Sequence, residues 1–162
     1  MSALTTLGIV HTTVSAVAVL AGVAALWRDK QISTRNRLGQ VYAVTTAITC
    51  LTALGIFQHG GFGKAHMLAL VTLAALALAL LAAHTTLLGR ASPYVATVSF
   101  SATFLFHLIP AVTEAGTRLP LGAPLLANAE APELKIASGV LFLLFLIGAT
   151  LQVRRMRAGG KA

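Results

Sequence analysis

The chain has 162 residues, of which 57% are hydrophobic and only 10% are charged, and its formal net charge is +8 at pH 7. A mean hydropathy of +0.85 excludes a monomer dissolved in water and predicts a membrane protein in contact with a lipid bilayer. The basic residues are scattered over several segments, so they indicate topology and attraction to anionic lipid, and we expect no nucleic-acid binding.

Five long apolar runs predict an all-α fold, an integral membrane bundle of five transmembrane helices. A helix of about 20 residues, at ~1.5 Å rise per residue, spans a hydrocarbon core of ~30 Å. In chain order the expected spans are residues 3–27, 38–57, 65–88, 93–112 and 134–153. Because five spans and their links use nearly the whole chain, residues 1–162 are expected to form a single domain.

The first run is apolar enough to suggest a signal peptide. It lacks a basic segment before the apolar stretch, however, and it ends at Trp27 and Arg28 without a cleavage site. We therefore expect it to remain attached as the first span.

Lys and Arg divide unequally between the two sides that five spans define. The links after the first and third runs and the C-terminal tail hold nine of them: Arg28, Lys30, Arg35, Arg37, Arg90, Arg154, Arg155, Arg157 and Lys161. The opposite links hold three: Lys64, Arg118 and Lys135. Since short basic loops stay in the cytoplasm, the N-terminus is predicted outside and the C-terminus inside, in a multi-pass protein of the bacterial inner (cytoplasmic) membrane.

Four of the five histidines fall in the predicted outer half of the bundle. His11 lies in the first run, His59 closes the second, His66 begins the third, and His107 lies near the outer end of the fourth. His84 stands ~27 Å from His66 along the third run, so a bis-histidine haem in the inner half is excluded. We expect His84 to have a structural role or to handle protons.

Polar or small residues recur at helical spacing in three of the runs. Such stripes are expected to turn away from lipid and toward the bundle interior. They comprise His11, Ser15, Ala18 and Gly22 in the first run, Thr45, Thr49, Thr52 and His59 in the second, and Ser99, Thr103 and His107 in the fourth.

Neutral imidazole nitrogens bind haem iron, copper or zinc. His11 and His107 match best in depth, so they are the predicted axial ligands of a b-type haem, and His59 and His66 join them as predicted ligands of a metal ion (Cu, Zn or Fe). Thr103 and Glu114 are expected to orient a ligating histidine. No catalytic motif accompanies them, so catalytic residues are not identified.

The link between the fourth and fifth runs, residues 113–133, is long for a bundle and carries Pro120, Pro124 and Pro132. We expect it to fold over the outer face as an ordered cap above His59 and His107, with Glu114 close enough to orient a histidine or to accept a proton.

Two function classes follow from these features. The first is a small redox or metal-binding protein that exchanges electrons with quinol or with a periplasmic or membrane redox partner. The alternative is a cofactor-free accessory or assembly subunit of a larger membrane complex, as a homo- or hetero-oligomer. A proton or solute carrier is weaker, because no acidic residue lies at mid-membrane.

Three segments resemble an uncharacterised family of bacterial polytopic membrane proteins: residues 35–42, residues 59–63, and residues 110–114 with 118–120. In that family a His-Arg-x-x-Gly-x-x-Tyr element opens a span. Gly39 and Tyr42 match this element, whereas Arg35 and Asn36 stand in place of its histidine and arginine. The resemblance implies an inner-membrane protein and assigns no activity.

Overall fold

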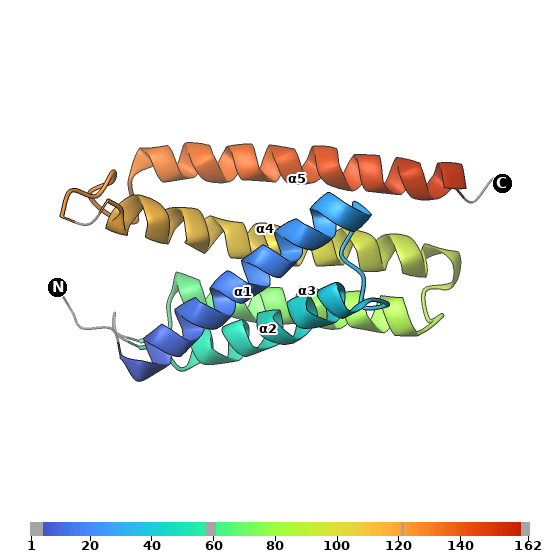
Figure 1. Ribbon diagram of the computed structural model, residues 1–162, viewed down its shortest axis with the longest axis horizontal. Helices are drawn as coiled ribbons and strands as arrows, with labels where there is room; N and C mark the ends of the chain where they lie inside the picture. The colour runs from blue at the N-terminus through green and yellow to red at the C-terminus, as the bar shows by residue number, and fades with distance from the viewer. Residues whose placement is uncertain (1–4, 58–60, 121, 160–162) are drawn as a thin grey trace.

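The computed structural model describes residues 5–57, 61–120 and 122–159, and regular structure in these residues is helical throughout. The helices are α1 (Thr6–Asp29), α2 (Arg37–Leu54), α3 (Lys64–His84), α4 (Ser92–Arg118) and α5 (Pro132–Gly159), with a short 3-10 turn η1 (Gly89–Ala91) ahead of α4 (Figure 1). The predicted all-α fold is confirmed, with one helix at each of the five apolar runs.

Within the described residues, four helical segments are long and apolar enough to cross a membrane: Thr6–Asp29, Lys64–His84, Gly89–Arg118 and Pro132–Gly159. They indicate a multi-pass membrane protein. α2 is not among them, because Arg37, Gln40 and four threonines lower the mean hydropathy of its 18 residues. The sequence prediction treated α2 as equal to the other spans, whereas it is the shortest helix of the five.

Capping side chains fix where the first two helices begin. The Thr5 hydroxyl accepts a hydrogen bond from the Gly8 N–H at the start of α1, and the Asn36 side chain accepts one from the Gly39 N–H at the start of α2. α1 ends where Lys30 takes a left-handed conformation (φ 60°) and its N–H bonds the Leu26 carbonyl. Each helix therefore begins or ends at a residue suited to that position.

The largest differences from the predicted boundaries are in α4 and α5, and α5 ends at Gly159, six residues after the expected residue 153. The fourth apolar run was expected to end at residue 112, but α4 continues through Pro110 to Arg118. Glu114 and Arg118 form an ion pair one turn apart, which suits a helix that continues beyond the apolar stretch. As a consequence, the link to α5 shortens to residues 119–131. α3 differs in the other direction and ends at His84, four residues before the expected boundary.

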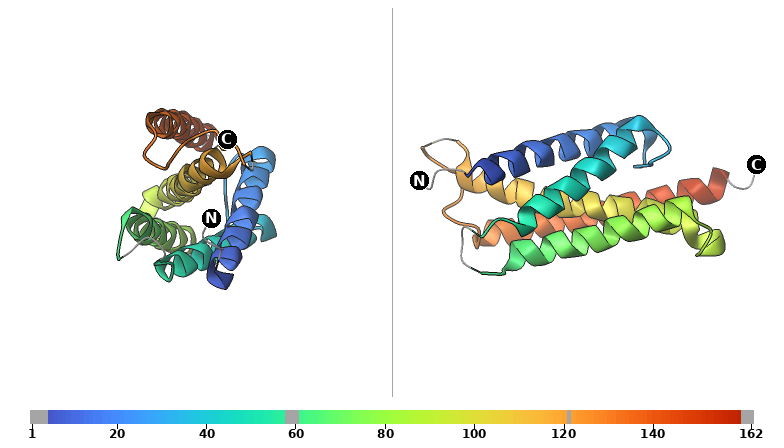
Figure 2. Two further views of the ribbon diagram at one scale, coloured as in Figure 1. Left: turned by 90° about the vertical axis from the view of Figure 1, so that its left-hand side faces the viewer. Right: turned by 90° about the horizontal axis from the view of Figure 1, so that it is seen from below.

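The chain reversals gather at two ends of the bundle. The start of α1, the turn from α2 to α3 and the link from α4 to α5 lie at one end, and the other reversals lie with the C-terminal part of α5 at the opposite end (Figures 1 and 2). We call the first the histidine end, because it holds His11, His66 and His107. We call the second the basic end, because it holds Arg28, Lys30, Arg35, Arg37, Arg90, Arg154, Arg155 and Arg157.

α4 lies between α5 and the other helices (Figure 2). The core is built from Tyr42 and Phe100, both nearly inaccessible, packed among small side chains such as Ala21, Ala25 and Ala79. Small residues allow helix backbones to approach closely, as membrane bundles require. α5 is different, because Leu134 is its one buried residue.

Candidate functional site

His11 reaches from α1 across to α2. Its Nδ1 lies 3.1 Å from the Thr49 carbonyl oxygen and 3.1 Å from the Thr52 hydroxyl oxygen. Because a carbonyl oxygen only accepts, Nδ1 carries the hydrogen and donates it, and Nε2 is left with the free lone pair. Histidines that ligate metals commonly donate their other ring N–H to a backbone carbonyl in this way.

His107 belongs to a buried chain of hydrogen bonds between α4 and α2. The Thr103 hydroxyl donates to the Phe100 carbonyl at 2.8 Å, so its oxygen accepts from the Tyr42 hydroxyl, also at 2.8 Å. His107 Nε2 lies 3.1 Å from the Thr46 hydroxyl, and the rings of His107 and Tyr42 meet edge to face with centroids 6.1 Å apart. These bonds fix the His107 imidazole in the helix interface.

The two histidines meet the same stretch of α2. Thr46 and Thr49 are three residues apart, which is ~4.5 Å along a helix, so His11 and His107 contact α2 within about one turn of each other. His11 and His107 thus form one polar region inside the histidine end, whereas Glu114 is exposed and pairs with Arg118.

The predicted inward stripe on α4 is confirmed, since Ser99, Thr103 and His107 are buried. On α1, Ala18 and Gly22 are buried and His11 and Ser15 are half-buried. On α2 the predicted stripe is confirmed at Thr49 alone among its described residues.

The buried face of α2 includes Tyr42, Thr46 and Thr49. Thr45 and Thr52 are half-buried and bond back to their own helix, and Thr52 also meets His11. Sequence reasoning therefore missed Tyr42 and Thr46 as members of the site. Tyr42 and Thr46 are four residues apart, and Thr46 and Thr49 are three apart. This helical spacing is the signal that places all three on one face.

His66 has a different role, at the start of α3. Its Nδ1 accepts a hydrogen bond from the Gly63 N–H at 3.2 Å, and its ring stacks against Phe57 and Phe62 at centroid distances of 4.7 and 5.2 Å. In the neutral ring the hydrogen is consequently on Nε2, which is buried and has no partner in the part of the chain that the structure describes. Metal ligation through Nε2 would require His66 to give up its bond to Gly63.

The remaining two histidines lie apart from this region. His84, at the basic end, has its Nε2 3.0 Å from the Thr34 hydroxyl, so it joins α3 to the link before α2. His59, predicted as a metal ligand, lies outside the described residues. Among the described residues, no three His, Cys, Asp or Glu side chains gather as a metal-binding group.

The link after α4 folds back on the histidine end, where it contacts α4 and the start of α3. That it covers His107 stays a prediction. The Leu126 N–H bonds the Gly116 carbonyl at 2.9 Å, and Lys64 at the start of α3 bonds Glu130 at 2.8 Å. Glu114, however, lies on α4 itself and pairs with Arg118. Its predicted role as a hydrogen-bond partner of a histidine stays a prediction.

The Lys64–Glu130 pair gives this link a pH dependence. The hydrogen bond and charge of Lys64 hold the pKa of Glu130 below its ordinary value of 4.5. A lowered pKa stabilises the folded link above pH 4.5, and the contribution disappears as the pH falls through the folded-state pKa.

Because the pair is exposed, we expect Glu130→Gln to reduce amide-exchange protection of residues 122–131 by a factor of only about two at pH 7. The variant and the wild type should converge below pH 4, and an unchanged difference there would contradict the role of this ion pair.

Comparisons of the chain with protein-family models, with curated proteins and with solved structures each find no match. The function is therefore argued from the geometry of the histidine end.

Proposed function

We propose that the chain is a five-span protein of the bacterial inner membrane, with its N-terminus outside and its C-terminus in the cytoplasm. α2 is the fifth span in this proposal, in addition to the four that are apolar enough alone. The nine-to-three division of basic residues supports the orientation, since positive loops stay in the cytoplasm. The grouping of chain reversals at two ends supports alternating spans (Figure 1).

Reporter fusions test this topology. A reporter after Ala162 should be active only in the cytoplasm, and one between Ala123 and Pro124 only outside. Removing the four basic residues of the first link together should weaken the preference most, because they follow the first span: Arg28, Lys30, Arg35 and Arg37. A C-terminal fusion that is active in the periplasm would show that the orientation is reversed.

Within this bundle, we propose that the outer histidine region binds a b-type haem or a metal ion for electron transfer with quinol or a protein redox partner. The observation that carries the proposal is the Nδ1–H bond of His11 to the Thr49 carbonyl, which leaves Nε2 free to ligate. The Thr49 hydroxyl is also buried and has no hydrogen-bond partner among the described residues. An unsatisfied polar group and a free imidazole nitrogen are what a bound ligand would complete.

His107 is the proposed second ligand, because it meets α2 within about one turn of His11. Its Nε2 has Thr46 as a partner, so ligation uses Nδ1 or exchanges the Thr46 bond for the ligand. When bound, a haem with two imidazole ligands supplies one-electron chemistry. The protein's own part is to orient both rings through threonine and carbonyl acceptors and to exclude water.

Absorption and metal analysis of protein purified from haem-replete cells test the site. A Soret band with a sharp reduced α band indicates haem, and stoichiometric metal without colour indicates zinc. Protein that is colourless and free of metal would contradict the site.

A cofactor-free accessory subunit is the second candidate. It is favoured by the bonds that already join His11, His107 and His84 to threonines on neighbouring segments, because such bonds stabilise a bundle without any cofactor. If the protein is such a subunit, the purified protein is colourless and metal-free. Replacing His11 then lowers the thermal stability and changes neither absorption nor metal content.

A further inference from the structure

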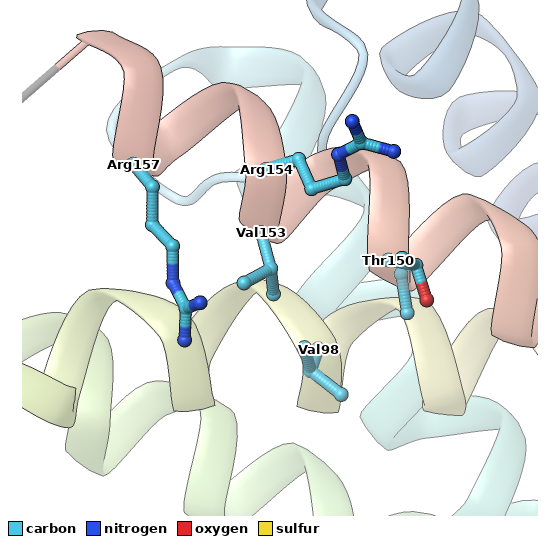
Figure 3. Close-up of a pocket in the computed structure, with 6 residues that line it drawn as sticks. Val98, Thr150, Val153, Arg154 and Arg157 are labelled. Carbon is cyan, nitrogen blue, oxygen red and sulfur yellow. The ribbon is translucent and has the colours of Figure 1, made fainter.

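A groove runs between α4 and α5 near the basic end. It encloses about 300 Å³ and is lined by Val98, Ala149, Thr150, Val153, Arg154 and Arg157. Figure 3 shows Val153 and Arg157 of α5 directed toward α4, with Val98 of α4 below them. The groove thus combines an apolar floor with two arginines of α5, of which Arg157 is directed toward α4 and Arg154 away from it (Figure 3).

The groove lies where a bilayer changes from hydrocarbon to headgroups. Arg154 follows the apolar part of α5 directly, and Val98 is six residues after the start of α4, which is ~9 Å along the helix. A lipid at this depth would place its chains against the valines and its phosphate near the arginines.

Within residues 5–57, 61–120 and 122–159, neither arginine has a carboxylate partner. The chain has four acidic side chains, and the one at the basic end, Asp29, is bonded to Arg28 and Asn36. Arg157 lies over the Tyr94 ring, 6.0 Å from its centroid, so a cation–π contact holds it beside α4. Arg154, one turn earlier on α5, completes a pair of exposed cations with unused donors.

We propose that this groove binds an anionic phospholipid. Planar guanidinium groups match the oxygens of a phosphate and can bind it through two parallel hydrogen bonds. Basic pockets between transmembrane helices are the setting in which anionic lipid headgroups bind, and the valine floor accepts an acyl chain. The site lies at the opposite end from the histidine region and does not depend on what that region binds.

Native mass spectrometry of the full chain in neutral detergent tests the proposal, with dioleoyl phosphatidylglycerol and dioleoyl phosphatidylcholine as probes. The wild type should bind phosphatidylglycerol on the order of tenfold more tightly than phosphatidylcholine. The double variant Arg154→Gln/Arg157→Gln should lose about tenfold in phosphatidylglycerol affinity, because two cations beside the phosphate are removed. Equal binding of the two lipids by the wild type would overturn the proposal.

A matched control separates the groove from the general positive charge of this end. Arg35→Gln/Arg155→Gln removes the same number of charges from residues that do not line the groove, so the affinity should change by less than about twofold. An equal loss in both double variants would show that the attraction is diffuse and would overturn the proposal. Val153→Trp keeps every charge and fills the groove, so it should also weaken binding, and retained affinity in this variant would exclude the groove as the site.

Discussion

Replacing either His11 or His107 by alanine is expected to abolish the reduced-minus-oxidised spectrum of the purified protein. The reason is that two imidazoles on α1 and α4 are the proposed axial ligands, and neither ligand has a substitute at the same depth. His84→Ala is the matched control, because it also removes a bond between a histidine and a threonine, here Thr34, but at the basic end. That variant should retain the full spectrum.

The three variants also distinguish ligation from packing. If the wild-type protein is colourless and all three variants lower the thermal stability to a similar extent, the histidines act through helix packing alone. A spectrum that persists in both His11→Ala and His107→Ala would move ligation to His59 and His66. In that case Gly63 should lose its bond to His66, and amide exchange at Gly63 should rise.

Gly39→Ala is expected to be the most destabilising of the small substitutions in the bundle. A methyl group at this position would collide with the backbone carbonyl of Ser33, which has no side-chain freedom with which to move away. It would also disturb the bond from the Gly39 N–H to the Asn36 cap, so both the link and the start of α2 would shift. We expect a loss of about 2–4 kcal/mol, measured as a lower unfolding temperature in detergent.

Gly139→Ala in α5 is the control for this substitution. A methyl group there meets no atom within 4 Å, so the stability should stay within about 1 kcal/mol of the wild type or increase. A similar loss in both variants would mean that helical glycine itself, and not the contact with Ser33, decides the effect.

Apolar length and charge were sufficient to predict the existence of all five helices. They failed at helix ends, because hydropathy describes the bilayer and a helix need not stop where lipid stops. α4 continues to Arg118, and its last turn holds the ion pair of Glu114 and Arg118. These two charged residues lower the mean hydropathy of the segment, so hydropathy predicts an earlier end. α3 stops at His84, where Thr85 takes an extended conformation and its hydroxyl bonds the Leu81 carbonyl.

The candidate site was predictable in its histidines but not in their partners. Helical spacing put His107 and Thr103 on one inward face, and both are buried. The roles of Tyr42 and Thr46 depend on how α2 is rotated against α4, and that rotation is set by contacts between distant parts of the chain, such as the one between the Tyr42 and Phe104 rings. The sequence separation of 61 residues between Tyr42 and Thr103 carries no local signal of their bond.

The threonine-rich helix α2 has a consequence for how the chain is made. As a span, it is the segment that hydrocarbon accepts least readily, and its Tyr42 and Thr46 bonds are to residues synthesised 61 positions later. A nascent chain that emerges only as far as α3 therefore holds two buried hydroxyl groups without their final partners. The buried bonds of α2 are completed only when α4 has been made. A truncated chain that ends before residue 107 is therefore a bundle that cellular quality control should recognise as unfinished.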